Sequence, residues 1–283
     1  MHSRLTWELT GFDRNTTNLL LQRVPAPSTG FTSEVFNGGR IENRGLEASL
    51  GVTAVQRSNV IWLVRTTYTR YTSVVKDLAG LPPFRPPHSG FGGLGVTFIQ
   101  EGKPLTQIVG RAFDANGNRT ATDVQIGNSA PDYRMGFVNE LTYGPFGLNV
   151  VLDYQHGGDI INLTQFLYDD SGLAADYGSP AWEYRMKGYN GGVMTPYIED
   201  ASFLKLREVS IRANVPQSWV SRAGLGARNV SVGVSGRNVL TWQKYSGLDP
   251  EVANVGSAAI RNNLDVSPYP PSRSFFFDFS VGF

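Results

Sequence analysis

The chain has 283 residues and a formal net charge of only +1, with Lys and Arg spread thinly, which excludes the basic surface of a nucleic-acid-binding protein. It contains no cysteine, so disulfide frameworks and cysteine-ligated zinc sites are excluded. Aromatic residues make up 12% of the chain and mean hydropathy is -0.20, a composition that favours β-structure. No stretch approaches the roughly 18–20 uncharged apolar residues of a membrane helix, so the chain could lie in a membrane only as a barrel.

The N-terminal residues, Met1–Trp7, lack the basic region, apolar core and small-residue cleavage site of a secretory signal. Because a barrel protein must be exported, we expect the chain to be a fragment of a longer protein.

Apolar and polar residues alternate with a period of two in several stretches, which indicates strands with one apolar and one polar face. In chain order the clearest are residues 46–53, 60–69, 148–155, 203–213, 230–235 and 274–283. Within residues 203–213 the apolar residues change parity after Leu206, so we expect a β-bulge near Arg207 or Glu208.

The last stretch has the cleanest alternation, with Phe276 as the single exception, and it ends on an aromatic residue. Its apolar face carries Phe275, Phe277, Phe279, Val281 and Phe283. We expect this face to contact lipid. Aromatic residues at other expected strand ends, including Tyr68, Tyr143 and Tyr154, suit interfacial girdles, although packing between two sheets would also explain them.

The connections are of two kinds that alternate along the chain. Tight links are expected at residues 56–59, 100–104 and 144–147, where Gly, Pro and Asn supply turn chemistry. Long polar links are expected at residues 23–38, 75–92, 114–132, 157–201 and 242–272, and no capped amphipathic helix is expected within them. Short links on one side and long loops on the other are typical of an antiparallel transmembrane β-barrel. We expect about eleven strands, an odd number that begins outside the cell and ends in the periplasm.

Several segments together resemble the C-terminal region of the SusC/RagA-like family of TonB-linked outer-membrane transporters. They are residues 37–47 (NGGRIENRGLE), 201–209 (ASFLKLREV), 235–242 (SGRNVLTW), 247–251 (GLDPE) and 269–273 (YPPSR), followed by the aromatic terminal strand. The resemblance implies that residues 1–283 form the last eleven or so strands of a 22-stranded barrel, without the plug domain and first barrel half.

The same resemblance implies uptake of nutrients such as oligosaccharides or peptides across the outer membrane, with no cofactor. The implied partners are a SusD-like surface lipoprotein as a lid, the TonB complex through the absent N-terminal part, the lipid bilayer, and the barrel-assembly machinery. That machinery would read the terminal strand from Phe275 to Phe283.

The longest link is rich in aromatic residues that suit stacking on a ligand or contact with a lid, because flat rings offer apolar area with a polar tip. The candidates are Tyr177, Trp182, Tyr184 and Tyr189. The alternative is that this link needs aromatic residues simply to fold on itself.

Catalytic and metal-binding patterns are weak, and we expect no enzyme and no metal site. The chain has three His residues, none in a metal-ligand spacing, and no nucleophile elbow or phosphate loop. Residues 114–118 are better explained as an Asx-rich turn than as a calcium loop. Residues 249–251 with Asp265 offer oxygen ligands, but no spacing argument selects them. The adjacent carboxylates at 169–170 and 199–200 are expected to be solvated loop charge.

Two rival assignments share the strand pattern: a soluble carbohydrate-binding β-sandwich and a siderophore-type TonB-dependent barrel. The terminal aromatic strand and the one-sided loop lengths favour the barrel over the sandwich. Residues 238–251 favour the SusC/RagA-like type over the siderophore type.

Overall fold

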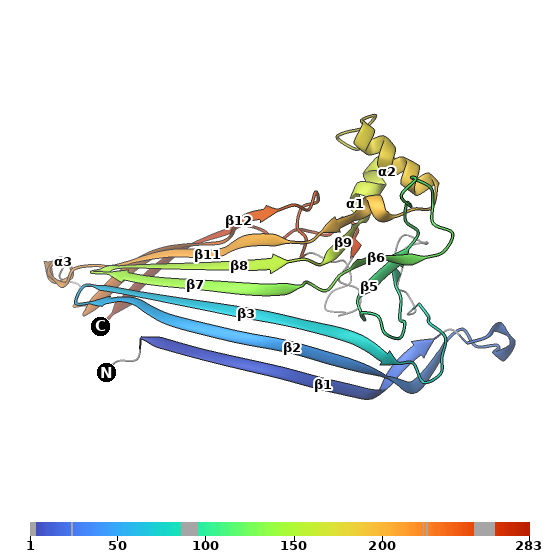
Figure 1. Cartoon of the computed structure of the whole chain (residues 1–283). Coiled ribbons are helices and arrows are strands. Elements are labelled where there is room, and N and C mark those ends of the chain that lie inside the picture. Colours follow the sequence, from blue (N-terminus) through green and yellow to red (C-terminus); the bar gives the residue numbers. More distant parts are fainter. Residues whose placement is uncertain (1–3, 24, 86–95, 223, 225, 252–263) are drawn as a thin grey trace.

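A computed structural model describes residues 4–23, 25–85, 96–222, 224, 226–251 and 264–283, and one eight-stranded antiparallel sheet dominates it (Figure 1). The strand order is β1-β2-β3-β7-β8-β11-β12-β14, so strands adjacent along the sheet follow one another in sequence. The strands are β1 (Leu5–Arg23), β2 (Glu34–Arg57), β3 (Val60–Asp77), β7 (Tyr133–Tyr143), β8 (Phe146–His156), β11 (Phe203–Asn214), β12 (Asn229–Gln243) and β14 (Ser274–Gly282).

Connections between neighbouring strands alternate between the two ends of the sheet, as expected. At one end lie the tight turns at residues 58–59 and 144–145 and the link 215–228, which contains α3 (Gln217–Arg222). At the other end lie the long connections, residues 24–33, 78–132, 157–202 and 244–273. The expectation of a tight turn at residues 100–104 between two such strands is wrong, because that turn lies inside one long connection.

The expected count of about eleven strands is not confirmed. Eight strands form the large sheet, and the six short strands belong to two three-stranded sheets in the long connections. These are β4 (Val96–Thr97), β5 (Gln107–Gly110), β6 (Val124–Asn128), β9 (Asp159–Asn162), β10 (Ile198–Asp200) and β13 (Leu264–Asp265). Eight is even, so β1 begins and β14 ends at the short-turn end (Figure 1), and the expected odd count is not confirmed. In the described chain the sheet does not close, and β1 and β14 form its edges.

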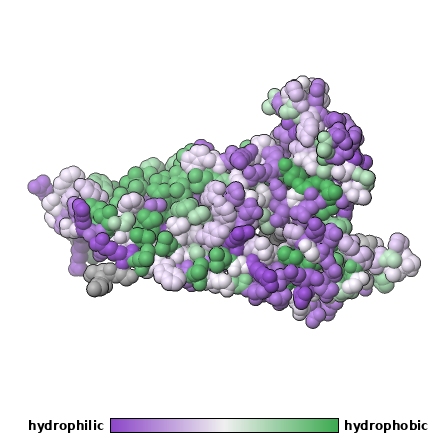
Figure 2. All heavy atoms as spheres, in the orientation of Figure 1, coloured by the Kyte–Doolittle hydropathy of each residue, from purple (hydrophilic) through white to green (hydrophobic). Residues whose placement is uncertain are grey.

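The large sheet has one apolar and one polar face, set by the register of its strands. One row across six strands is entirely apolar: Trp62, Leu141, Leu148, Ile211, Val234 and Phe277. The row beside it shows the opposite face, with Glu140, Asn149, Ser210 and Ser235 as direct partners. Because successive strand residues alternate in direction, this register gathers the apolar side chains on one face. Figure 2 shows hydrophobic residues over the strands toward α3 and mostly hydrophilic residues at the loop-bearing end.

The expected bulge in β11 is confirmed. The register of β11 shifts between Leu206 and Glu208 against both neighbouring strands, which leaves Arg207 as the extra residue. Opposite it, β12 carries two residues, Asn238 and Val239, between its pairs with Glu208 and Leu206, and Asn238 has a φ of 51°. A bulge of this kind restores the apolar face on both sides of the irregularity.

The third long connection contains two helices that the sequence analysis missed, α1 (Leu163–Asp170) and α2 (Pro180–Asn190). Both have side-chain N-caps: Asn162 accepts from the backbone N–H of Gln165, and Ser179 accepts from that of Trp182, with Pro180 following Ser179. Such caps satisfy otherwise unpaired N–H groups at the first turn. The short 3-10 helices η1 (Pro27–Thr29) and η2 (Thr195–Tyr197) complete the elements.

The largest buried apolar cluster of the described residues lies in this loop region, not in the large sheet. It consists of Ile108, Ile161, Leu163, Phe166, Met194 and Tyr197. The cluster joins β5 and β9 to α1 and η2, so two long connections share one core. No helix in the described part of the chain combines the length and apolarity needed to cross a membrane.

Candidate functional site

At the loop-bearing end of the sheet, two of the four aromatic residues predicted to contact a ligand or lid, Tyr177 and Tyr184, are exposed. Tyr177 is 61% exposed, and its ring centroid lies 4.6 Å from that of the half-buried Trp182. Tyr184 is 53% exposed and lies 5.6 Å from Phe113 of the preceding long connection. The α2 side of this region therefore presents rigidly held aromatic area, because each ring rests on another.

Tyr189 is placed differently. Its ring lies 4.5 Å from Phe166, and it packs against the buried cluster defined above. Tyr189 thus has the packing contact that the folding alternative expects. Ligand or lid contact by all four residues stays a prediction.

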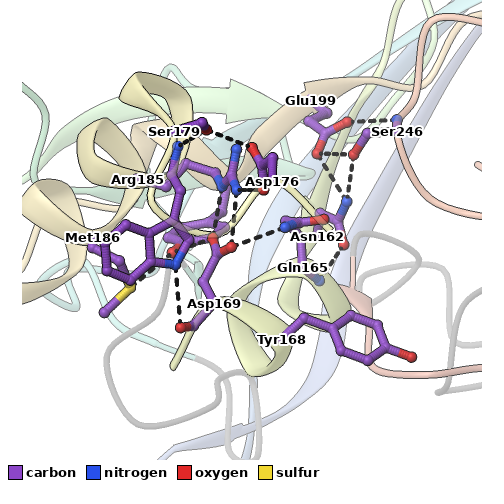
Figure 3. Close-up of polar contacts among 12 residues, drawn as sticks. Asn162, Gln165, Tyr168, Asp169, Asp176, Ser179, Arg185, Met186, Glu199 and Ser246 are labelled. Atoms are coloured by element: carbon purple, nitrogen blue, oxygen red, sulfur yellow. Dashed lines mark hydrogen bonds and ion pairs between the residues drawn. The ribbon is translucent and has the colours of Figure 1, made fainter. Parts of the chain in front are cut away.

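A buried carboxylate, Asp169, holds α1 and α2 together (Figure 3). Its side chain is fully buried and accepts hydrogen bonds from Arg185 at 2.6 and 2.9 Å, from the Tyr197 hydroxyl at 3.0 Å and from Gln165 at 2.9 Å. Burial and this hydrogen bond to Asp169 raise the pKa of Tyr197. The expectation that residues 169–170 are solvated is therefore wrong at position 169, where four donated hydrogen bonds offset the cost of burying a charge.

The arginine of this pair also fixes the link between the helices. Arg185 donates to Asp176 at 2.7 Å, and Ser179 donates to the same carboxylate at 3.3 Å (Figure 3). The hydrogen bond from Arg185 holds the pKa of Asp176 below its ordinary value. The turn before α2, and Tyr177 within it, are thereby fixed to the helix pair.

A second polar cluster, also in Figure 3, ties the last long connection to β9 and β10. Glu199 accepts from Asn162 at 2.8 Å and from the backbone N–H and hydroxyl of Ser246 at 2.7 and 2.8 Å. Its neighbour Asp200 accepts from Ser202 and lies 3.7 Å from Lys244. Residues 199–200 are thus structural contacts, contrary to the expectation of solvated charge.

The third cluster attaches the same connection to the polar face of the sheet. The Lys205 ammonium is buried and donates to Asp249 at 2.6 and 2.8 Å and also to Glu251. Arg207, the bulged residue, donates to Glu251 at 2.5 Å and to Asp153 at 2.6 Å. Burial alone would raise the pKa of Glu251, but hydrogen bonds from Arg207 and Lys205 outweigh it and lower the pKa.

The acidic residues that the sequence analysis considered as cation ligands have partners within the protein. Asp249 and Glu251 are neutralised by protein cations, and Asp265 accepts hydrogen bonds from Tyr245 and Thr164. Asp114 accepts backbone N–H groups of Asn116 and Asn118 at 2.9 Å each, which confirms the Asx turn. Across the described ranges, no group of three or more His, Asp or Glu residues is arranged to hold a metal ion.

The polar face below the loops is hollowed into a groove of about 630 Å³ that crosses five strands. Its charged lining residues are Glu140, Glu208, Arg212, Arg237 and Asp278. Arg237 and Glu208 form an ion pair at 3.4 Å. The groove is hydrophilic, in contrast to the opposite face of the same strands.

The terminal strand β14 displays its apolar residues as expected. Phe275, Phe277, Phe279 and Phe283 are 64%, 84%, 72% and 80% exposed. Phe276, the exception to the alternation, lies on the polar face, where the Arg237 guanidinium sits 5.4 Å from its ring centroid. A row of phenylalanines this exposed requires an apolar environment.

Comparison with known proteins agrees with this geometry. The family model described as "TonB dependent receptor-like, beta-barrel" matches residues 1–166, more than half of the chain. This chain belongs to the β-barrel family of TonB-dependent receptors. Members of this family are transporters and receptors of the outer membrane, not a class of enzymes, and the outer-membrane location expected from the sequence is confirmed.

Curated TonB-dependent receptors of Formosa agariphila match along the whole chain. TonB-dependent receptor P3 is 26% identical over 99% of this chain, and P26 is 27% identical over 100%. The chain spans 32% and 33% of these proteins, about a third of their length.

Solved structures show the same fold. The RagAB peptide importer in its open-open state matches 99% of this chain and 33% of its own, with a TM-score of 0.77 and 20% identity. The closed-closed state gives a TM-score of 0.72. The SusC/RagA-like resemblance inferred from the sequence motifs is confirmed.

Proposed function

We propose that this chain forms part of the barrel wall and the extracellular loops of a TonB-dependent transporter that imports nutrients of the oligosaccharide or peptide class. The observation that carries the proposal is the division of one antiparallel sheet into an apolar face and a polar, hollowed face, with the connections at residues 24–33, 78–132, 157–202 and 244–273 at the same end. In a closed barrel these faces meet lipid and lumen.

Energetics support lipid on the apolar face. Trp7, Phe277 and Phe279 each expose more than 70% of their surface, and moving a side chain of this size out of water stabilises by about 1.5–3 kcal/mol. An aromatic row borders this band on the loop side: the Tyr133 ring centroid lies 5.6 Å from that of Tyr68 and 6.0 Å from that of Tyr154. A soluble β-sandwich would cover the face with a second sheet, and the described residues provide none.

The partners we propose are a SusD-like surface lipoprotein and TonB as the source of energy. A lid is supported by the fold match to RagAB and by the accessible apolar residues of the α1–α2 region, such as Leu173 at 73% exposure and Tyr177. We also propose that the barrel-assembly machinery reads β14, because its phenylalanines form a regular apolar row.

Cysteine labelling tests the orientation directly, since the chain has no native cysteine. Leu173→Cys lies in a long connection and Ser58→Cys in a tight turn at the opposite end. In cells that express the protein, a membrane-impermeant maleimide should label Leu173→Cys directly but Ser58→Cys only after the outer membrane is permeabilised. Equal labelling of both in intact cells contradicts the proposal.

Cargo class is tested by uptake. Cells with and without the gene would be supplied with a labelled oligosaccharide mixture or a labelled peptide mixture, with TonB present or deleted. TonB-dependent uptake of one mixture, lost on gene deletion, supports transport and selects the class. Uptake unchanged by gene deletion argues against the proposal for that mixture.

A further inference from the structure

A cavity of about 380 Å³ lies between the polar face of the sheet and the loops that fold over it. The strands contribute Tyr71, Arg134 and Gln155, and residues 105–106, 129–131, 159–160 and 250–251 close it from the loop side. Three long connections and three neighbouring strands therefore converge here, just inside the loop-bearing end of the sheet.

Arg134 is held in a fixed orientation in this cavity. It pairs directly with Gln155 across the β7–β8 ladder, and its Nε donates to the Gln155 Oε1 at 2.9 Å. Gln155 is 5% exposed, and its Nε2 donates to the carbonyl oxygen of Ala201 at 3.1 Å. A buried amide locked to the backbone thus orients the guanidinium plane, while no residue that the structure describes accepts a hydrogen bond from the two terminal nitrogens.

The guanidinium has no carboxylate partner among the described residues within 4.0 Å. Two acidic residues line the same cavity, but both have other partners. Glu251 is bound by Lys205 and Arg207, and Asp159 accepts the backbone N–H of Asn128 at 2.7 Å. Arg134 itself is exposed, and no carboxylate of the described residues forms an ion pair with its guanidinium, which is therefore accessible to an anion.

We propose that this cavity is a carboxylate-binding subsite for cargo, an inference that rests on the transport function proposed above. The terminal nitrogens of Arg134 would take the two carboxylate oxygens in the fork geometry that guanidinium groups favour. Tyr71, 44% exposed on the neighbouring strand β3, supplies a flat apolar surface for the body of the ligand. A uronic acid unit of an oligosaccharide and the C-terminus of a peptide carry the same group.

Binding to purified protein in detergent, followed by titration calorimetry, tests this subsite. The probes are a short galacturonic acid oligomer and its methyl ester, and a tripeptide and its C-terminal amide. We expect at least one acid probe to bind, and Arg134→Gln to weaken that binding about 10- to 100-fold, the effect of one charge-assisted pair. Ester and amide forms should bind weakly to both proteins.

Two further variants separate a binding role from a structural one. Arg134→Lys keeps the charge and should recover part of the affinity, and Arg65→Gln, on the same polar face but outside the cavity, should bind as the unaltered protein does. Equal binding of acid and ester, no loss in Arg134→Gln, or no binding of either acid at millimolar concentration overturns the proposal. The labelling result at positions 58 and 173 is independent, so this subsite can fail while the transport assignment stands.

Discussion

Replacement of Lys205 by Met tests how the last long connection is attached to the sheet. The Lys205 side chain is 4% exposed and its partner Asp249 is 7% exposed, so the substitution leaves a nearly buried carboxylate that has lost its lysine partner. Breaking a buried pair from one side costs about 3–5 kcal/mol, mostly from the uncompensated charge. Residues 246–251 can escape this cost by leaving the sheet, which predicts local opening before global unfolding.

Limited proteolysis measures the local opening of residues 246–251, and thermal unfolding in detergent measures the loss of global stability. We expect Lys205→Met to be cleaved faster near residues 246–251 and to unfold at a lower temperature, and Lys205→Met combined with Asp249→Leu to recover much of both losses. The matched control is Arg237→Met, whose ion pair is 3.4 Å long with the arginine 62% exposed. An exposed pair contributes about 0–1 kcal/mol. The reasoning is refuted if Lys205→Met changes proteolysis and unfolding no more than Arg237→Met does.

Three further outcomes are expected. In the α1–α2 region, Tyr189→Ala should lower the free energy of unfolding by about 3 kcal/mol in denaturant titrations because it opens the buried cluster, whereas Tyr177→Ala should change it by less than about 1 kcal/mol. Similar losses in both variants would contradict the division between packing and accessible aromatic residues. On β14, Phe277→Arg should cost about 2–4 kcal/mol on a lipid-facing surface and reduce folded protein in heat-modifiability gels, while Asp278→Asn on the polar face should not. Burial, with the nearby acidic residues, raises the pKa of Asp159, so the folded state binds this proton more tightly than the unfolded state and loses stability as pH rises above the ordinary Asp range. Asp159→Asn should therefore raise the unfolding temperature at neutral pH and flatten the pH dependence of that temperature. An unchanged pH profile would count against this reasoning.

Six of the eight strands of the large sheet were predictable because each carries its own signal, whereas no alternating stretch was predicted within β1 or β7. Alternation at residues 148–155 and 230–235 indicates which face is apolar without knowledge of neighbouring strands, and the parity change after Leu206 even locates the bulge. The terminal row of phenylalanines is equally local. A period of two is a property of each strand by itself, so it can be recognised in a single sequence.

The loop region was predictable to a much smaller extent. The helices α1 and α2 have 8 and 11 residues and no wide apolar stripe, so periodicity did not reveal them. Asp169 looked like solvated charge because its partners Arg185 and Tyr197 come from later residues that only the fold brings near. The count of about eleven strands is not confirmed, because the six short strands belong to two separate sheets in the long connections.

The paired irregularity at Arg207 and Asn238 constrains how this part of the chain can change length in evolution. Deleting one residue from β11 there would reverse the parity of the loop-side half, turning Lys205 toward lipid and Leu206 toward the lumen. β12 carries its own extra residues at the same level, so a deletion in either strand needs compensation in the other. We therefore expect insertions and deletions among relatives to accumulate in residues 24–33 and 215–228, while the interval between the two bulges keeps a constant length.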